Sequence, residues 1–193
     1  SLGADKTFTI TTGHQLNIFT GPLYFIYKIV TVINACKTLK QAYPDYNFVP
    51  VYWMASEDHD FEEINHFFLE GKKYEWQTDQ TGAVGHFDPS GVKEIAEKLP
   101  KGAEFFAQAY SQKTLADAGR DYVNHLFGQE GLVVVDGDNP ELKKLFTPVI
   151  EEDLFKHNPE KLVSKTSSSL EDLGYKTQVT AREINFFYLE HGI

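Results

Sequence analysis

The sequence predicts an α/β fold with a mainly parallel sheet flanked by helices, and three observations support this prediction. Residues 8–12 alternate apolar and hydroxyl side chains, which is typical of a strand. Isoleucines and a cysteine recur at helical spacing between Ile26 and Cys36. The mostly apolar run 47–55 is typical of a buried parallel strand. A strand, a helix and a strand in this order indicate a βαβ unit.

The first helix is expected to begin at Thr20-Gly21-Pro22, with Thr20 as the N-cap and the proline near the first turn. Its apolar pattern continues to about Gln41. Inside the second strand, Pro50 argues against full pairing, because proline has no N–H to donate to a ladder.

A short helix and a hairpin are expected after the second strand. Asp60 followed by Glu63 fits a capping box, so the helix should begin at Phe61. Residues 66–69 and 74–78 flank a Gly-Lys-Lys turn and are expected to pair as a hairpin.

Helical patterning resumes over 92–99 and again over 103–127, where Gly128 closes the pattern. Residues 132–135 form a further buried strand that ends in Asp136.

Two matching helix starts follow, at Asn139 and Asn158, each with a cap, a proline and an acidic residue in order. The second of these helices should end at Gly174, and 178–189 should contain a last strand.

Composition limits the classes of function. The chain has 193 residues and a net charge of −10, and no Lys/Arg cluster offers the basic face that nucleic acid requires. No apolar run is long enough for a membrane span, and neither a membrane segment nor a signal peptide is expected. Cys36 is the single cysteine, so a reducing cytoplasm is expected. Because Met54 is the single methionine, Ser1 is not expected to be a native start, and the chain is interpreted as part of a longer protein.

Candidate site residues lie where predicted strands end, because ligands of open α/β sheets bind beyond the carboxyl ends of the strands. Thr12 ends the first strand, Gly13-His14-Gln15 follows it directly, and Ser56–Asp60 follows the second strand. The helix start at Gly21 offers free N–H groups to an anion, and Lys28 adds a positive charge. The absence of GxGxxG and GxxxxGK patterns argues against a dinucleotide fold or a P-loop.

The run Glu57-Asp58-His59-Asp60 places three carboxylates beside an imidazole. Such groups repel one another unless they bind something or face water, and His59 next to carboxylates suits a general base. In the alternative interpretation Asp60 only caps the next helix, and the other two acids are solvated. His14 has two interpretations as well: it neutralises phosphate charge in a transition state, or it is hydrogen-bonded to loop backbone.

A metal site is the rival chemistry. His59, Glu62, Glu63 and His66 would share one helical face, and Glu63-x-x-His66 matches half of a carboxylate–histidine site. No second helix carries a comparable motif, so a solvated helix face is the other interpretation, and the sequence does not require a metal.

Four segments together resemble the BshC family, the cysteine-adding enzymes of bacillithiol biosynthesis. They are TTGHQLNIFTGPLYFIYK, VPVYWMASEDHDFEEINH, GLVVVDGDNPELKKLFTPVIEEDL and YKTQVTAREINFFYL, at 11–28, 49–66, 131–154 and 175–189. The resemblance implies one Rossmann-like core of nucleotidyltransferase type over 1–193, truncated at both ends, with 66–130 as an inserted segment. It also implies a longer parent protein whose coiled-coil arm supports a homodimer.

The resemblance extends to individual residues. At position 14 many relatives carry glutamine where this chain has His14, and at position 27 many carry histidine where it has Tyr27. A role that needs an imidazole at position 14 is therefore less favoured than a role for the loop and the helix start. The residues that match the family pattern are Thr20, Gly21, Pro22, Leu23, Tyr24, Lys28, Glu57, Asp58, His59, Asp60, Arg182 and Glu183.

The implied reaction joins cysteine to glucosaminyl-malate and forms the thiol bacillithiol. We expect ATP or another adenine nucleotide to activate the cysteine carboxylate as an acyl-adenylate. The helix start at Gly21 and Lys28 would hold phosphates, Asp58 or Asp60 would bind an ammonium group, and His59 would take the proton of the attacking amine. The rivals are a metal-dependent hydrolase using His59, Glu63 and His66, and a nucleotide-binding module without chemistry of its own.

Overall fold

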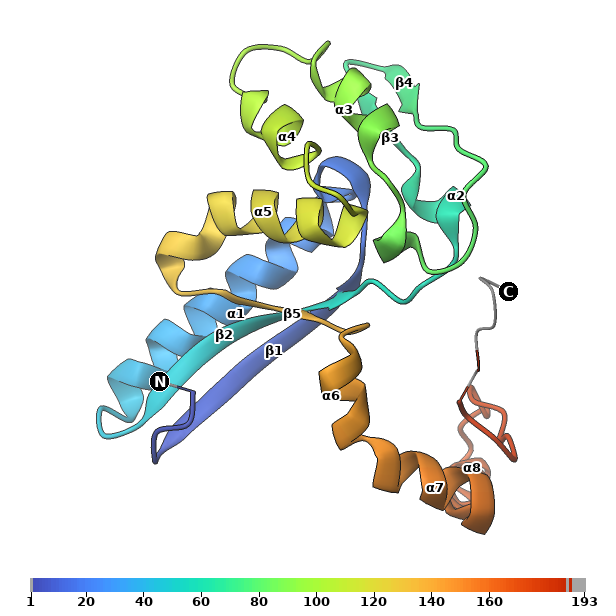
Figure 1. Ribbon diagram of the computed structural model, residues 1–193. Helices are drawn as coiled ribbons and strands as arrows, with labels where there is room; N and C mark the ends of the chain where they lie inside the picture. The colour runs from blue at the N-terminus through green and yellow to red at the C-terminus, as the bar shows by residue number, and fades with distance from the viewer. Residues whose placement is uncertain (1, 187, 189–193) are drawn as a thin grey trace. The chain divides into compact units, whose positions relative to one another are not determined.

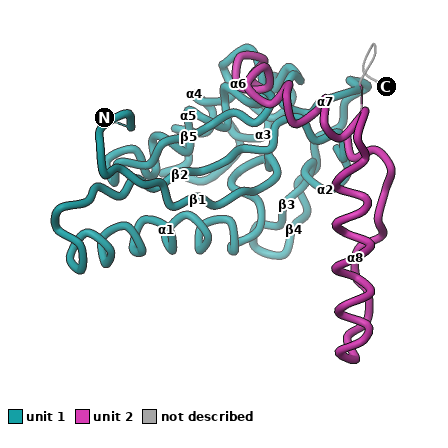
Figure 2. Tube along the Cα trace, turned by 90° about the horizontal axis from the view of Figure 1, so that it is seen from below, with its two compact units in different colours: residues 1–138, 191–193 teal, residues 139–190 magenta. Residues whose placement is uncertain are grey.

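The computed structural model describes residues 2–186 and 188 (Figure 1). They form two compact units, one reaching to Asp138 and one beginning at Asn139 (Figure 2). The expectation of a single domain with an inserted segment at 66–130 stays a prediction.

The sheet of the first unit is parallel, as predicted. It contains β1 (Thr7–Gln15), β2 (Asn47–Ala55) and β5 (Val133–Asp136), in the order β1-β2-β5. β2 is therefore the central strand. Pro50 is accommodated there because the pairing of β2 with β5 begins only at Val51. The proline thus has a neighbouring strand on one side only, opposite Ile10 of β1.

Two helices pack on one face of this sheet, α1 (Leu23–Ala42) and α5 (Leu115–Phe127) (Figure 1). The Phe25 ring of α1 contacts Tyr52 edge-on, with ring centroids 5.3 Å apart. Gly119 of α5 lies against Met54. Because alternate residues of a strand face the same side, Tyr52 and Met54 show that both helices cover the same face.

The start of α1 differs from the sequence prediction. The N-cap is Pro22, and Thr20 lies before it in a 3-10 turn (η1, Ile18–Thr20). Phe19 and Thr20 both have left-handed backbone, with φ of 50° and 69°. Gly21 follows at φ 60°, where a Cβ atom would meet the Asn17 side chain at 2.7 Å. The chain therefore turns sharply before the helix can begin, and Thr20 cannot act as its cap.

The predicted hairpin forms, with β3 (His66–Leu69) antiparallel to β4 (Lys72–Glu75). Its second strand begins earlier than the predicted 74–78, because Lys72 and Lys73 pair with β3 instead of forming the turn. The predicted helix over 103–127 is broken into two. Thr114 interrupts it as the N-cap of α5, because its hydroxyl accepts the N–H of Asp117 at 3.1 Å. The remaining short elements of this unit are α2 (Phe61–Ile64), η2 (Val84–His86), α3 (Ser90–Ala96), α4 (Glu104–Ala109) and η3 (Gly128–Glu130).

The second unit contains α6 (Pro140–Leu145), α7 (Thr147–Lys156) and α8 (Asn158–Asp172). The cap predicted at Asn139 is confirmed, since its side-chain oxygen accepts backbone N–H groups at 2.9 and 3.2 Å.

The cap predicted at Asn158 is wrong. His157 occupies the N-cap position with φ 51°, and the Asn158 side chain instead donates to Glu152 at 2.7 Å. The end predicted at Gly174 is confirmed, because Gly174 has φ 85° and donates its N–H to the carbonyl of Glu171 at 2.9 Å.

The last predicted strand does not form in the described part of 178–189, which is 178–186 and 188. Its remaining positions, 187 and 189, lie outside the described residues. The backbone N–H of Asn185 is bonded to the carboxylate of Asp153 at 2.7 Å, and its side-chain amide is bonded to the same carboxylate at 2.9 Å. The Asp153 carboxylate therefore accepts the backbone hydrogen bond of Asn185 that a neighbouring strand would have accepted in a sheet.

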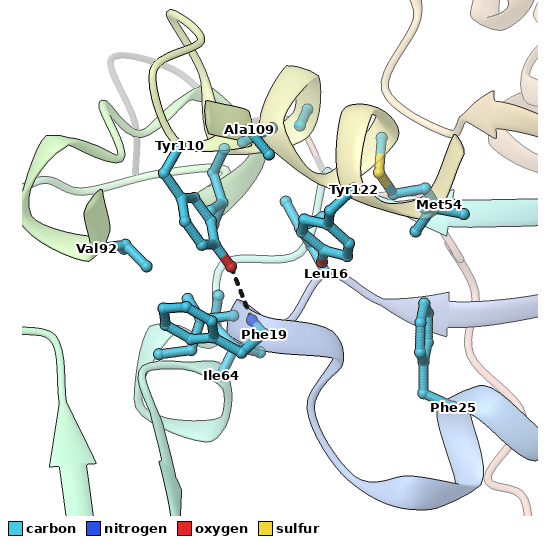
Figure 3. Packing of buried hydrophobic residues seen from close by; sticks show 14 of the residues in the cluster. Leu16, Phe19, Phe25, Met54, Ile64, Val92, Ala109, Tyr110 and Tyr122 are labelled. Carbon is cyan, nitrogen blue, oxygen red and sulfur yellow. Dashed lines mark hydrogen bonds between the residues drawn. The ribbon is translucent and has the colours of Figure 1, made fainter. Parts of the chain in front are cut away.

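The core of the first unit is formed by residues of the sheet, of α1 and of the α3–α5 segment (Figure 3). Two of its buried tyrosines, Tyr110 and Tyr122, are tied to the turn that follows β1. The Tyr110 hydroxyl oxygen accepts the N–H of Phe19 at 2.7 Å, and the Tyr122 hydroxyl donates to the carbonyl of Asn17 at 2.7 Å. Burial raises the pKa of both tyrosines above the usual value, so both hydroxyls stay protonated. Over residues 2–186 and 188, no helix is both long and apolar enough to cross a membrane.

Candidate active site at the strand ends

The carboxyl ends of the three parallel strands lie at one edge of the sheet. Gln15 pairs with Ala55, and Met54 pairs with Asp136, so the segments that follow β2 and β5 begin beside the end of β1. The structure thus brings together the two segments that the sequence singled out. It adds a third, Asp136–Asp138, which follows β5.

Gln15 connects the first two segments. Its side-chain nitrogen donates to Asp58 Oδ2 at 2.8 Å and to Glu63 Oε2 at 3.0 Å. One amide group therefore bridges two carboxylates that would otherwise repel each other. Because Glu63 is engaged in this way and Asp60 makes no side-chain cap bond, the predicted capping box at α2 is wrong.

Asp58 is held as a carboxylate. Burial alone would raise its pKa, but the hydrogen bonds from Gln15 and from the backbone N–H groups of Asp60 and His59 outweigh burial and lower the pKa. The Asp60 N–H lies 3.0 Å from Asp58 Oδ1. Asp58 is therefore an acceptor at neutral pH and suits the binding of a cation or donor.

Glu57 presents a different environment. Its Oε2 atom is buried and has no hydrogen-bond partner among the described residues. Gly137 lies against it, and a Cβ atom there would stand 2.9 Å from Glu57 Oε2 and 2.8 Å from Trp53 Nε1. A buried carboxylate oxygen without a donor is unfavourable, so this atom is suited to receive an ammonium or another strong donor.

Ser56 and Asp136 join the ends of β2 and β5. The buried Ser56 hydroxyl donates to Asp136 Oδ1, which also accepts the N–H of Asp138 at 3.0 Å. Arg120 of α5 donates to Asp136 Oδ2 at 3.4 Å. Sequence reasoning placed Asp136 at a strand end but did not count it as a site residue. The signal was available, because an acidic Asp-Gly-Asp run directly follows an apolar strand.

The η2 turn braces the segment after β2 from outside. The Gly85 N–H donates to the Ser56 carbonyl at 2.9 Å, and the Val84 N–H donates to the Asp58 carbonyl at 2.8 Å. In the same turn, His86 Nε2 lies 2.7 Å from Asp138 Oδ2. Nothing in the sequence pattern indicated these contacts, which are two backbone bonds and one side-chain contact between segments far apart in the chain.

His59 and Asp60 are exposed beside this cluster. Asp60 occupies the N-cap position of α2, as in the alternative interpretation, but its side chain makes no cap bond. The general-base role of His59 stays a prediction.

His14 is buried at the end of β1, with 8% of its surface exposed. Its Nδ1 lies 2.9 Å from the carbonyl oxygen of Gln15, which is the backbone bond of the alternative interpretation. The ring packs between Tyr24 and Phe25 of α1, with centroids 5.0 and 5.4 Å away. Burial lowers the pKa of His14, the Gln15 carbonyl opposes this change, and the charge of Lys28 adds to it. The imidazole is therefore neutral at neutral pH.

The start of α1 supplies the positive side of the site. Lys28 donates to the Gly13 carbonyl at 2.8 Å, and its ammonium lies 5.8 Å from the Tyr24 ring centre. The first turn of the helix contains no acidic residue, and the N-cap has no capping side chain. Thr12 lies within β1 opposite Tyr52. Thr20 and Gly21 form the turn that delivers the chain to this helix start.

The rival metal site does not form. α2 ends at Ile64 and His66 begins β3, so the expected helical face does not exist. His66 Nδ1 is instead 2.9 Å from Asn65 Oδ1. Across residues 2–186 and 188, no three His, Cys, Asp or Glu side chains gather in a group that could hold a metal ion.

Arg182 and Glu183 belong to the second unit. There the Glu183 carbonyl lies 3.1 Å from His157 Nδ1. Their expected part in ligand binding stays a prediction.

A polar hollow of about 490 Å³ opens beside Arg120 in the first unit. Arg120 also contacts Asp136, so the hollow lies next to the end of β5. It is lined by Gln112, Asp117, Arg120, Asp121, Asn124 and Val134.

Comparison with known proteins agrees with the fold and points to one family. Residues 1–193 match the family model described as "Bacillithiol biosynthesis BshC, N-terminal Rossmann-like domain". Relatives named "Putative cysteine ligase BshC" include proteins of Flavobacterium psychrophilum and Cytophaga hutchinsonii, 53% and 48% identical over 96% and 100% of this chain. A protein of the same name from Natranaerobius thermophilus is 33% identical over 100% of the chain. The chain spans 37% to 39% of the length of these relatives.

Proposed function

We propose that this chain, which belongs to the BshC family as its N-terminal Rossmann-like domain, carries the amide-forming site of a bacillithiol-synthesis ligase. The parent protein would join cysteine to glucosaminyl-malate after a nucleotide activates the cysteine carboxylate. The name cysteine ligase, given to relatives that match the whole of this chain, supports the proposal at its coarser level. The geometry of the strand ends supports the more specific part of the proposal, the binding of an amine and of a nucleotide.

One observation carries the assignment: two carboxylates of adjacent residues are prepared to bind a donor group. Asp58 is held ionised by Gln15, and Glu57 has a buried oxygen without a partner. We therefore assign the amine of the acceptor substrate to Glu57 and Asp58. This revises the sequence expectation, in which Asp58 or Asp60 bound the ammonium group.

The positive side of the site suits the phosphates of ATP or another adenine nucleotide. Lys28 belongs to α1, and its ammonium group contacts the Gly13 carbonyl near the end of β1. α1 is a long helix whose first turn carries no acidic residue. Anions are stabilised by the free N–H groups and the dipole at a helix start. Phosphates at Lys28 and an amine at Glu57 would place the two reactants on either side of the β1 end.

The proposed reaction has two steps. The cysteine carboxylate attacks the α-phosphorus of ATP and releases pyrophosphate, which leaves an acyl-adenylate. The neutral amine then attacks the acyl carbon, the C–N bond forms, and AMP leaves with the electrons of the C–O bond. The proton lost by the amine would go to the exposed His59, which directly follows Asp58 in the chain.

The full-length parent tests this proposal directly. It is incubated with cysteine, ATP and glucosaminyl-malate, and the products are followed by mass spectrometry. Bacillithiol together with AMP and pyrophosphate is the expected result. ADP and phosphate would contradict the adenylate step but leave a ligase. Absence of bacillithiol with all three substrates would contradict the ligase.

A nucleotide-binding module without chemistry is the second candidate, because Lys28 and the start of α1 would be sufficient to bind the phosphates. Variants of Glu57 and Asp58 separate the two. If they change the affinity for substrates but leave turnover intact, the binding module is favoured.

A further inference from the structure

The buried side-chain nitrogen and oxygen atoms of the described residues are nearly all hydrogen-bonded. The exceptions are Thr7 Oγ1, His14 Nε2 and Glu57 Oε2. Thr7 begins β1 and lies at the opposite end of the sheet, whereas the other two lie at the strand ends. Buried polar atoms without partners are rare in folded proteins, and His14 is more than nine-tenths buried. Its Nε2 atom is therefore a candidate ligand contact.

The contacts of the other ring nitrogen fix the character of Nε2. A carbonyl oxygen can only accept, so the 2.9 Å contact with Gln15 requires the hydrogen on Nδ1. The Asn17 amide lies 3.3 Å from His14 Nδ1 and 3.3 Å from the same Gln15 carbonyl. With Nδ1 protonated, the amide hydrogen goes to the carbonyl. Nε2 then carries a lone pair, and it can only accept a hydrogen bond.

The charge around His14 limits which kind of group can donate a hydrogen bond to Nε2. Burial and Lys28 both keep the ring neutral, and the Lys28 ammonium is fixed at Gly13, the residue before His14. A second cation placed at Nε2 would be repelled by Lys28 and would have to lose its hydration. A neutral hydroxyl group has neither disadvantage.

The surface beside His14 is aromatic. Tyr24 is tilted by 40° against the imidazole and is 54% exposed, whereas Phe25 is buried behind the ring. An aromatic wall with a few fixed polar groups is typical of small-molecule sites. Such a wall packs against the apolar face of a sugar ring while the acceptor takes one of its hydroxyls.

We propose that His14 Nε2 accepts a hydrogen bond from a hydroxyl of a sugar ring that lies against Tyr24. The inference rests on the proposed function for the identity of the ligands, which offer two such rings. One is the ribose of the nucleotide, and the other is the glucosamine ring of glucosaminyl-malate. His14 would thus determine specificity through a neutral contact, and a glutamine at this position could make the same contact through its side-chain oxygen.

The test is a thermodynamic cycle on the full-length parent by titration calorimetry. The ligands are ATP with its 2′-deoxy and 3′-deoxy forms, and glucosaminyl-malate with its deoxy-sugar forms. Each is measured on the wild type, His14→Phe and His14→Gln. Loss of the relevant hydroxyl should weaken wild-type binding about tenfold, as expected for one hydrogen bond. His14→Phe should weaken binding of the hydroxyl form equally, with no further loss for the deoxy form. His14→Gln should retain most of the affinity.

The outcomes are distinct. Coupling with ATP alone assigns the ribose, and coupling with glucosaminyl-malate alone assigns the glucosamine ring. If no deoxy form binds more weakly than its parent ligand to the wild type, the inference is wrong, whether or not the variants fold. A buried water at Nε2 would give this result.

Nitrogen-15 NMR of the histidine side chains separates failure of this inference from failure of the proposed function. In the wild-type parent, His14 should be neutral with the hydrogen on Nδ1, and adenosine or methyl glucosaminide should shift Nε2. A hydrogen on Nε2, or no shift with either probe, overturns the inference even in an active ligase. A shift in a protein that makes no bacillithiol keeps the inference and removes the proposed reaction.

Discussion

The backbone N–H of Phe19 donates to the hydroxyl of Tyr110 at 2.7 Å, although the two residues are 91 positions apart in the sequence (Figure 3). Tyr122 holds the same turn by donating its hydroxyl to the carbonyl of Asn17 at 2.7 Å. The turn after β1 contains two consecutive left-handed non-glycine residues, Phe19 and Thr20, which are unfavourable without such support. The segment between β4 and β5 therefore fixes the loop that delivers α1 to the site.

Tyr110→Phe should destabilise the protein through this turn. The substitution keeps the ring but leaves the buried Phe19 N–H without an acceptor, which costs about 1–3 kcal/mol. Denaturant unfolding of the full-length parent measures the loss. Tyr175→Phe, which changes an exposed ring of the second unit, is the matched control and should have almost no effect. Equal stability of both variants would show that the Tyr110 hydroxyl does not support the turn.

Gln15→Leu should raise the pKa of Asp58. The substitution removes the largest of the effects that lower this pKa, while the burial that raises it remains. Because the folded-state pKa of Asp58 lies below its unfolded value, its ionisation stabilises the fold above the unfolded pKa. That contribution is lost as pH falls through the folded pKa. In Gln15→Leu the loss should begin at higher pH.

Carbon-13 NMR titration of the carboxyl groups measures the pKa of Asp58 directly. Gln41→Leu, at an exposed position near the end of α1, is the control and should leave the titration unchanged. An unchanged Asp58 titration in Gln15→Leu would mean that the amide does not hold the carboxylate.

Gly137→Ala should weaken binding of the amine substrate. The added methyl group would stand 2.9 Å from Glu57 Oε2 and 2.8 Å from Trp53 Nε1, so the carboxylate has to move. Calorimetry with glucosaminyl-malate should show about tenfold weaker binding, equivalent to about 1.4 kcal/mol. Combined with Glu57→Gln, the glycine substitution should add little. If the losses of affinity in the double variant were fully additive, the effect of Gly137→Ala would not act through Glu57.

Ser56→Ala should loosen the junction between β2 and β5. The buried hydroxyl donates to Asp136, so its removal should cost about 1 kcal/mol of unfolding free energy. Asp136→Ala should cost more, since it also releases Arg120 and leaves the Ser56 hydroxyl unpaired. Asp79→Ala, at an exposed position, is the control. The account of this junction fails if Ser56→Ala and Asp79→Ala have the same unfolding free energy.

The strands of the parallel sheet were predicted well because apolar runs and alternating patterns mark them in the sequence. The run 47–55 matches β2 at both ends, and its polar continuation places Asp58 at the sheet edge. The same logic, applied to Asp136, would have found the third segment. Local patterns failed where a distant residue took over their hydrogen bonds. Glu63 bonds to Gln15 instead of closing a capping box.

Other parts of the site could not be predicted from local pattern. The residues near Thr20 in the sequence do not indicate that Tyr110 holds the turn at Phe19. They also do not indicate that the N-cap of α1 is Pro22. The helical face expected from Glu63 to His66 assumed a longer helix, whereas α2 ends after one turn. The unpartnered state of His14 Nε2 depends on packing against α1, which only the folded chain reveals.

The most direct test of the strand-end site is the rate of bacillithiol formation by the full-length parent with Glu57→Gln and Asp58→Asn. Both substitutions keep the side-chain shape and remove the charge that would bind the amine. We expect kcat/KM for glucosaminyl-malate to fall at least a hundredfold, equivalent to about 2.7 kcal/mol of transition-state stabilisation. Glu94→Gln, at an exposed position of α3, should keep the wild-type value. Wild-type kcat/KM in folded Glu57→Gln and Asp58→Asn variants would contradict the account.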